Sequence, residues 1–284
     1  MAGDGDLMRA SAAHAEIFAA NRAEGRLSLT VAAAPSGTVR RRVHEAGALR
    51  LRFPNSEPGA PLEAVIINTA GGMTGGDRFD VDIKVGGGAR LTVTTAAAEK
   101  IYRSLGPPTE ISVKLDVGPN GALDWLPQAT IVFDQMRLRR TIDVTLARNA
   151  RLLFAEATVF GRSAMGESIR DGDLFDRRRV RIDGALVFAE TIGLDGDIAR
   201  RLAERAVAND GVAIASVVKA PAGDDCAAAV RSINDSFAGE VGVSAWNGLA
   251  VVRLVAPDDV SLQRDLVRVL NALGVNPMPR LWLN

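Results

Sequence analysis

Two carboxylates are the residues that could most readily do chemistry, because the sequence around each of them is apolar. Strand alternation puts Glu156 on one face with the leucine and phenylalanine side chains of residues 152–160. It puts Glu190 on one face with the apolar side chains of residues 186–194 in the same way. A carboxylate on such a face is normally paired, protonated or bound to a cation, because burying its charge alone is strongly unfavourable. Each acid therefore either pairs with an arginine, such as Arg162, or belongs to a functional site.

A glycine-rich segment could cradle a ligand against the main chain. Residues 68–78 read Asn-Thr-Ala-Gly-Gly-Met-Thr-Gly-Gly-Asp-Arg, so that the pair Gly71 and Gly72 and the pair Gly75 and Gly76 precede Asp77. Glycine permits positive φ and the close approach of another backbone. A phosphate-binding loop also requires a helix N-terminus behind it, whereas the alternating residues 79–85 predict a strand. The sequence therefore favours a tight bend between two strands over a nucleotide site.

Other residues that could bind metals or act as nucleophiles are sparse. The two histidines, His14 and His44, and the one cysteine, Cys226, are too far apart in sequence for a typical zinc or haem motif. A single cysteine also excludes an internal disulfide and fits a reducing compartment. The sequence contains no Gly-x-Ser-x-Gly motif, which would mark a nucleophilic serine.

Charge and hydropathy exclude two classes of partner. Lys plus Arg and Asp plus Glu number 34 each, so the net charge is zero and nothing supports binding to nucleic acid or to an anionic membrane. The basic run 177–181 is expected to alternate between the two faces of a strand, where it is solvated or paired with acids. The chain has neither an export signal nor an apolar run long enough to span a membrane. We expect a soluble, cytoplasmic protein.

Short alternating segments must position these residues. Roughly ten of them, separated by turns rich in glycine, proline and asparagine, predict a mainly β fold with a large β body over residues 26–196. Within it, Asp183-Gly184 is a two-residue hairpin signal. Residues 1–25 form a polar, alanine-rich segment that we expect to be frayed.

Residues 197–284 predict a small α+β portion packed on the β body, either as part of one domain or beside it. Two or three helices are expected, within residues 197–209, 224–237 and 257–273. Between the second and third of these, Asn247-Gly248 separates two strand-like runs and is the strongest short hairpin signal in the chain.

Five blocks of sequence, taken together, are similar to those of a known family. They read Asn-Thr-Ala-Gly-Gly-Met-Thr-Gly-Gly-Asp from residue 68, Thr-Ala-Ala-Ala-Glu-Lys-Ile-Tyr-Arg-Ser from 95, Asp-Trp-Leu-Pro-Gln from 124, Gly-Arg-Ser-Ala-Met-Gly-Glu from 161 and Pro-Arg-Leu-Trp from 279. In this order they resemble the UreD-type, or UreH, urease accessory proteins. Thr74 departs from the usual aliphatic residue, and Glu99 from the usual small hydroxyl. The motif residues that the resemblance singles out are Gly71, Gly72, Gly75, Gly76, Lys100, Tyr102, Arg103, Trp125, Pro127, Gly161, Arg162, Gly166, Glu167, Arg280 and Trp282.

The resemblance implies a non-enzymatic helper in urease maturation. Such proteins form a complex with a helical partner, UreF, and a GTPase, UreG, and bind the urease apoprotein while nickel is delivered to its active site. Their fold is mostly β, with strands stacked helically and very few helices, which agrees with the predicted β body. GTP hydrolysis belongs to the GTPase partner, and this accounts for the absence of a P-loop here.

The resemblance also gives the two acids a role. The family is proposed to carry nickel through an internal channel, and carboxylates bind nickel more weakly than histidine or thiolate does. Acids on apolar strand faces would suit such a low-affinity path. We expect Glu156 and Glu190 to line it, with Asp77 as a third candidate. Nickel would then be cargo in transit, and no tightly bound cofactor is expected.

Two other interpretations remain open from the sequence. One is a β enzyme that binds carbohydrate or nucleotide through the glycine segment and Asp77, with Glu156 and Glu190 acting as an acid/base pair, as carboxylates do in glycosidases. The other is a passive β scaffold without an ion path. Nickel-dependent activation of urease on co-expression distinguishes a urease maturation factor from both of these alternatives.

Overall fold

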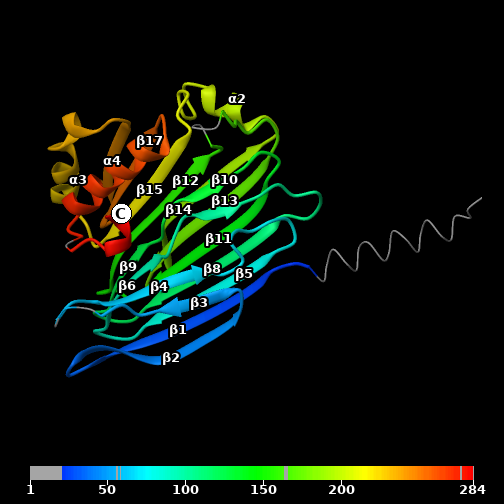
Figure 1. The fold of residues 1–284 in the computed structure, drawn as a ribbon. Coiled ribbons are helices and arrows are strands. Elements are labelled where there is room, and N and C mark those ends of the chain that lie inside the picture. The colour runs from blue at the N-terminus through cyan, green and yellow to red at the C-terminus, as the bar shows by residue number, and fades with distance from the viewer. Residues whose placement is uncertain (1–20, 56, 58, 163–165, 276, 284) are drawn as a thin grey trace, which may run out of the picture.

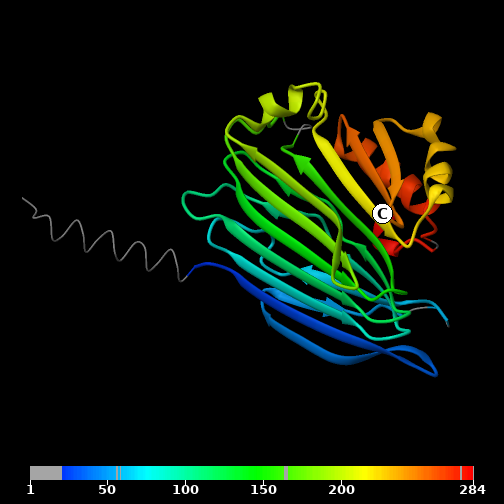
Figure 2. The same cartoon turned by 180° about the vertical axis from the view of Figure 1, so that it is seen from behind.

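Two β-sheets stacked against each other make up most of the molecule. The computed structural model describes residues 21–55, 57, 59–162, 166–275 and 277–283, and Figures 1 and 2 show it from opposite sides. Strands outnumber helices throughout, so the mainly β fold is confirmed.

The strands of sheet A are β1 (Glu24–Ala34), β2 (Gly37–Gly47), β5 (Arg78–Val85), β8 (Thr109–Val117), β11 (Arg137–Leu146), β13 (Asp173–Ile182) and β14 (Ala185–Asp195). Those of sheet B are β3 (Leu49–Arg52), β4 (Leu62–Asn68), β6 (Arg90–Thr95), β7 (Glu99–Ile101), β9 (Ala122–Leu126), β10 (Thr130–Val132), β12 (Arg151–Phe160), β15 (Ala213–Ala220), β16 (Glu240–Trp246) and β17 (Leu249–Ala256). The helices are α2 (Ile198–Ala203), α3 (Asp224–Arg231) and α4 (Asp259–Ala272), with 3-10 turns η2 (Asn234–Ser236) and η3 (Arg280–Trp282).

From β4 to β13 the chain winds back and forth between the two sheets. It places β4, β6, β9 and β12 in sheet B and β5, β8, β11 and β13 in sheet A, and neighbours within each series are parallel. The strand order is β14-β13-β11-β8-β5-β1-β2 in sheet A and β16-β17-β15-β12-β9-β6-β4-β3 in sheet B, where β10 also pairs with β12 and β7. Each turn of the winding therefore adds one strand to each sheet, which is the stacked arrangement that the resemblance implied.

Strand alternation builds the core between the sheets. Leu29, Ile83, Leu115 and Val144 lie side by side across four strands of sheet A, and all are buried. Each such side chain contributes about 1.5 to 3 kcal/mol by leaving water. On each strand, the residues next to these in sequence point outward. None of the described helices covers the outer face of sheet A (Figure 2). The parallel register thus stacks like residues in rows, apolar inside and polar outside.

The C-terminal portion extends sheet B instead of forming a sheet of its own. β15, β17 and β16 follow β12 as antiparallel strands. Asn247 and Gly248 have φ of 51° and 77°, which confirms the predicted hairpin between β16 and β17. The helices α3 and α4 pack on the outer face of these strands (Figure 1), where they close a second apolar cluster. The boundary between the two portions, near residue 196, stays a prediction.

Two expectations concern the N-terminus and membranes. Residues 1–25 are predicted to be frayed, and the first 20 of them lie outside the described residues. β1 begins at Glu24, within the last two residues of that predicted segment. None of the described helices combines the length and the apolar character needed to cross a membrane.

Candidate functional site

Glu156 is buried between the two sheets and is held by two neighbours. Its side chain, on β12, is 4% exposed, and its Oε2 lies 3.0 Å from Nη1 of Arg140. Its Oε1 accepts a hydrogen bond of 2.7 Å from the indole Nε1 of Trp125. The sequence placed Glu156 correctly on an inward face. It is paired with Arg140 rather than with Arg162, which instead forms an ion pair with Glu167.

Arg140 joins this acid to a second carboxylate, Asp176. The Nε and Nη2 atoms of Arg140 donate to the two carboxylate oxygens of Asp176 at 3.0 and 2.6 Å, and its Nη1 donates to Oγ1 of Thr130 at 3.0 Å. Such a two-pronged contact fixes both geometry and charge. Arg140 therefore has a hydrogen-bond acceptor on each of its three guanidinium nitrogens.

Glu190, the second acid predicted from the sequence, continues the same network. Arg178 donates to Asp176 at 2.6 Å and to Glu190 at 3.0 Å. Glu190 also accepts hydrogen bonds of 3.1 Å from Oγ of Ser216 and Nε of Arg253. The Arg253 side chain is 62% exposed, so the network runs from the buried Trp125 and Glu156 to the solvent.

Strand register explains why these groups meet. On sheet A, Arg140 is directly opposite Asp176 and Arg178 is directly opposite Glu190. On sheet B, Glu156, Ser216 and Arg253 are direct neighbours across β12, β15 and β17. Polar groups on two successive inward levels of sheet A therefore face one polar row of sheet B across the interior. Three carboxylates alternate with three arginines, and the formal charges cancel.

The pairing shifts the pKa values of the central groups. Burial alone would raise the pKa of Asp176, but Arg140 and Arg178 outweigh it and lower that pKa from its ordinary value of 3.8 to about 2. Burial alone would lower the pKa of Arg140, but Asp176 and Glu156 raise it above its ordinary value. Both groups are therefore charged at neutral pH.

One polar atom of the network has no partner. Nε of Arg178 is buried and makes no hydrogen bond to any described residue. Within the described residues, no three side chains of the His, Cys, Asp or Glu type lie close enough together to hold a metal ion. The carboxylates at the site are therefore separated by arginines instead of gathered into one cluster.

Asp77 lies apart from this network and closes the glycine segment. Its two carboxylate oxygens accept hydrogen bonds of 2.8 Å from the backbone N–H groups of Ala23 and Thr74. A Cβ on Gly72, which has φ of 145°, would lie 2.4 Å from the Tyr102 ring, and one on Gly75 would lie 1.9 Å from Oγ of Ser104. The segment is thus the tight bend between strands that its sequence predicts.

Three of the sequence blocks meet at this end of the sheets. The rings of Tyr102 and Phe133 stack 5.0 Å apart, and the Arg162 guanidinium lies 5.0 Å from the centre of the Phe133 ring. Nε of Arg162 is 2.6 Å from Oε2 of Glu167. Lys100 and Arg103 contribute their carbonyl groups, which accept hydrogen bonds from Met73 and Thr74. The middle of the fourth block, residues 163–165, lies outside the described residues, although Gly161 and Gly166 on either side have positive φ.

The remaining blocks hold the C-terminus against sheet B. The indole of Trp282 donates to the carbonyl of Leu126 at 3.0 Å, and the amide of Gln128 donates to the carbonyl of Leu281 at 3.0 Å. Pro127 follows β9 directly, and Arg280 begins η3.

In the second block, burial raises the pKa of Glu99, which accepts a hydrogen bond of 3.0 Å from Asn68.

Sequence reasoning missed Arg140, Asp176 and Arg178, although a signal for them exists. Each occupies an inward position of an alternating strand, between apolar residues such as Leu138 and Ile142 in β11. Applying to these positions the argument used for Glu156 would have revealed all three. The basic run 177–181 did behave as expected, because Arg178 points inward to acids while Arg177 and Arg181 lie outward near Asp143. Phe133, in contrast, carried no comparable signal.

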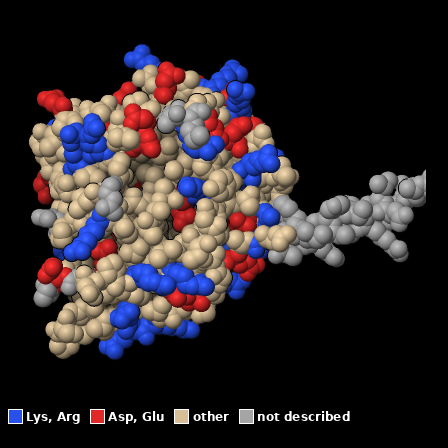
Figure 3. Space-filling model, in the orientation of Figure 1, with Lys and Arg blue, Asp and Glu red and all other residues tan. Residues whose placement is uncertain are grey.

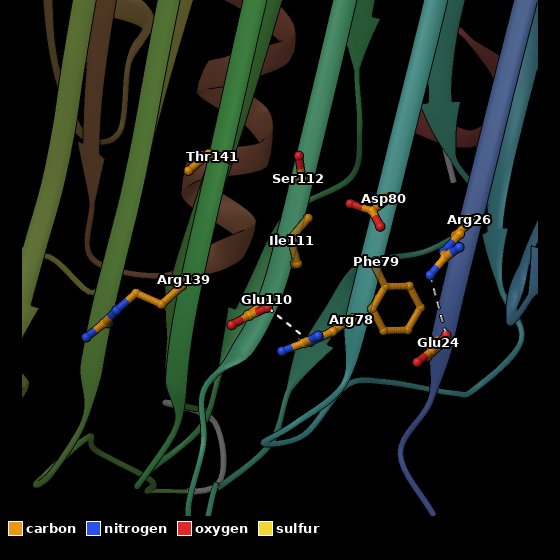
Figure 4. Close-up of a pocket in the computed structure, with 10 residues that line it drawn as sticks. All are labelled: Glu24, Arg26, Arg78, Phe79, Asp80, Glu110, Ile111, Ser112, Arg139 and Thr141. Atoms are coloured by element: carbon orange, nitrogen blue, oxygen red, sulfur yellow. Dashed lines mark ion pairs between the residues drawn. The ribbon is translucent and has the colours of Figure 1, made fainter. Parts of the chain in front are cut away.

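The outer face of sheet A presents a shallow groove of a different kind. It has a volume of about 400 Å³ and is lined by charged side chains from four neighbouring strands (Figure 4). In it Nε of Arg78 lies 3.1 Å from Oε2 of Glu110, and both side chains are more than half exposed. This pair is therefore solvated and contributes little to stability.

Comparisons with known proteins are consistent along almost the whole chain. A family model described as UreD urease accessory protein matches residues 23–283. The urease accessory protein UreD of Rhodopseudomonas palustris strain HaA2 is 52% identical over 273 residues, which cover 96% of this chain and 98% of that protein. That of strain BisB5 is 50% identical over 275 residues, 97% of each chain. Urease accessory protein UreD 3 of Bradyrhizobium sp. strain BTAi1 is 47% identical over 274 residues, 96% of this chain and 98% of that protein.

Proposed function

The chain belongs to the family of UreD urease accessory proteins, and on that premise we propose that it is a non-enzymatic scaffold that binds the urease apoprotein and helps to pass nickel to its active site. A role in urease maturation, in contact with other components of that process, follows from the family. The finer proposal names a UreF-type helical protein and a UreG-type GTPase as its partners, in the cytoplasm.

The ion network is the observation that supports the nickel part of this proposal. Glu156, Asp176 and Glu190 follow one another between the sheets and end at the exposed Arg253. Oxygen donors hold nickel more weakly than imidazole or thiolate does, so a carboxylate can accept the ion and release it again. A line of such groups inside an otherwise apolar interior suits passage better than storage.

The arginines determine how a cation could use this line. Arg140 contacts both Glu156 and Asp176, and Arg178 contacts both Asp176 and Glu190. An arginine that keeps one acid can release the other, which frees a carboxylate without leaving the guanidinium unpaired. We therefore take the arrangement seen here as the closed form of the path, in which arginines occupy the positions that nickel would take in turn.

Two glutamine variants test the path directly. Glu156→Gln and Glu190→Gln keep the shape of each side chain and one of its two acceptor oxygens and remove its charge, while Arg140 and Arg178 each keep Asp176. We expect the complex with the apoprotein to assemble as in the parent protein and the nickel content of the resulting urease to fall. Both quantities are measured after co-expression with urease and its accessory proteins. Glu110→Gln, on the solvated outer face, is the matched control and should load nickel fully.

Other outcomes would change the proposal. Full nickel loading with both variants would remove these acids from the path. Failed assembly that is rescued when Arg140→Gln is added to Glu156→Gln would show instead that the acid only neutralises the buried arginine.

A further inference from the structure

An apolar groove runs beside α4 on the outer face of sheet B. Its volume is about 650 Å³. One wall is α4, the floor comes from β10 and β12, and the C-terminal segment around η3 closes one side. In the orientation of Figure 1, broad uncharged surface lies between scattered basic and acidic groups (Figure 3). The apolar side chains that matter here are Ile131, Ala157, Val159, Val260, Val267 and Leu283.

The helix α4 is apolar on two of its faces. Leu262, Leu266 and Val269 are buried against the strands and anchor it. A second stripe, Val260 and Val267, is seven residues apart and so lies on one face, which lines the groove. Val260 is 63% exposed and Leu283, across the groove, is 67% exposed. Large apolar side chains gathered in one hollow indicate a surface that another molecule covers.

The floor of the groove favours a helix over a strand as the occupant. β10 is already paired on both of its edges, with β12 and with β7, so it offers no free ladder of backbone groups to an extended segment. A helix satisfies its own backbone and needs only an apolar surface. The alanines at 98, 129 and 157 leave room for its close approach. α4 itself has 14 residues, so a helix of about 20 Å would lie alongside it.

The charges on the rim determine the character of that helix. Arg264 and Arg268 line the groove on the α4 side, and among the described residues Asp259, at the start of the helix, is the only acid that lines it. Arg268 lies 3.8 Å from Asp265, whereas Arg264 has no ion pair with any described residue. A second copy of this chain would bring its own arginines against these and would present a concave surface to a concave surface. The rim is instead complementary to acidic side chains.

We propose that this groove receives an amphipathic helix of a partner protein, whose apolar stripe covers Val260, Val267 and Leu283 and whose carboxylates lie beside Arg264. The proposal rests on the proposed function, because the partner is taken from the same accessory assembly. It assigns that partner a surface on the opposite side of sheet B from the ion network, so docking and ion passage use different faces of the molecule.

Charge substitutions in the groove test this inference. The probe is the UreF-type helical protein, co-expressed with this chain and captured through a tag on it. Val260→Glu puts a charge on the apolar stripe in the first turn of α4, where the helix dipole favours an acid, so folding is retained. We expect capture to weaken at least about tenfold, and Arg264→Glu to weaken it less. Val207→Glu and Arg205→Glu are controls in another exposed segment and should bind like the parent.

A photocrosslinker at position 267 gives an independent measurement. Crosslinks from this position should map to one helical segment of the partner that carries Asp or Glu beside an apolar stripe. Parent-like capture with Val260→Glu and Arg264→Glu, or crosslinks to an extended segment, would overturn the groove inference while urease activation by the parent protein still upheld the proposed function. Failure of the parent protein to activate urease or to capture the partner would overturn both.

Discussion

The interior between the two sheets is apolar in one half, and in the other half an ion network lies among apolar side chains. Where β1, β5 and β8 face β4, β6 and β9, the core consists of aliphatic side chains such as Leu29, Ile83 and Leu123. Where β11, β13 and β14 face β12, β15 and β17, the ion network crosses the same space. Both halves follow the same alternation and belong to the same two sheets, so residue type alone makes the difference.

The comparison shows what each kind of interior can do. Apolar burial is non-directional and roughly proportional to area, so the first half tolerates exchange among aliphatic side chains of similar volume. The network is directional, because each carboxylate oxygen is matched to a particular N–H group. Removing one partner leaves a buried charge uncompensated, which is more unfavourable than the pair was favourable. A polar interior of this kind is expected where function requires it.

The largest effect is expected from Arg140→Met. It leaves Glu156 and Asp176 without their shared cation, and we expect the free energy of unfolding to fall by about 3 to 5 kcal/mol. Urea unfolding measures this. Leu115→Ala, in the apolar half, is the matched core variant and should lose about 2 to 5 kcal/mol through the cavity it leaves.

A rescue experiment distinguishes the loss of charge pairing from the loss of apolar packing, even where the two variants lose similar free energies of unfolding. Adding Glu156→Gln and Asp176→Asn to Arg140→Met removes the stranded charges and should recover most of the loss. If the triple variant is no more stable than Arg140→Met alone, charge pairing is not what holds this half together.

A smaller loss of stability is expected when the pH is lowered. Burial raises the pKa of Asp176, but its arginines lower it overall from 3.8 to about 2. Because the pKa is lower in the folded state, the stabilisation is fully present above about pH 4 and is lost as the pH falls towards 2, by roughly 2 kcal/mol. We therefore expect the free energy of unfolding of Asp176→Asn, measured between pH 5 and 2, to lack this dependence on pH. Leu115→Ala should keep the shape of the parent curve, and an unchanged curve in Asp176→Asn would contradict the assigned pairing.

The smallest effect is expected on the outer face of sheet A. Arg78 and Glu110 are 3.1 Å apart, as the network pairs are, but their side chains are 67% and 51% exposed. Solvent screens such a pair, so Arg78→Gln should change the free energy of unfolding by no more than about 1 kcal/mol. A loss as large as that of Arg140→Met would show that burial does not distinguish the two sets of ion pairs.

The elements and their inward faces were predictable because they depend on local pattern. Alternation identified the strands, Asp183-Gly184 and Asn247-Gly248 identified two hairpins, and the segments 224–237 and 257–273 contain α3 and α4. The same pattern placed Glu156 and Glu190 inside. It failed at Leu186, which is 51% exposed because a bulge in the pairing of β13 with β14 shifts the register there.

The sequence by itself determined that two acids face the interior, that the glycine segment is a bend, and that the five blocks belong to one family's pattern. Only the tertiary structure decided that Arg140, Asp176 and Arg178 link those acids into one network, while Asp77 lies elsewhere and closes a loop. The reason is physical: the direction of a side chain follows from the alternation of its own strand, but its partners depend on which strands become neighbours. Here the parallel winding brings β11 beside β13 and packs both against β12, so Arg140 meets Asp176, 36 positions away, within sheet A and meets Glu156 across the interior.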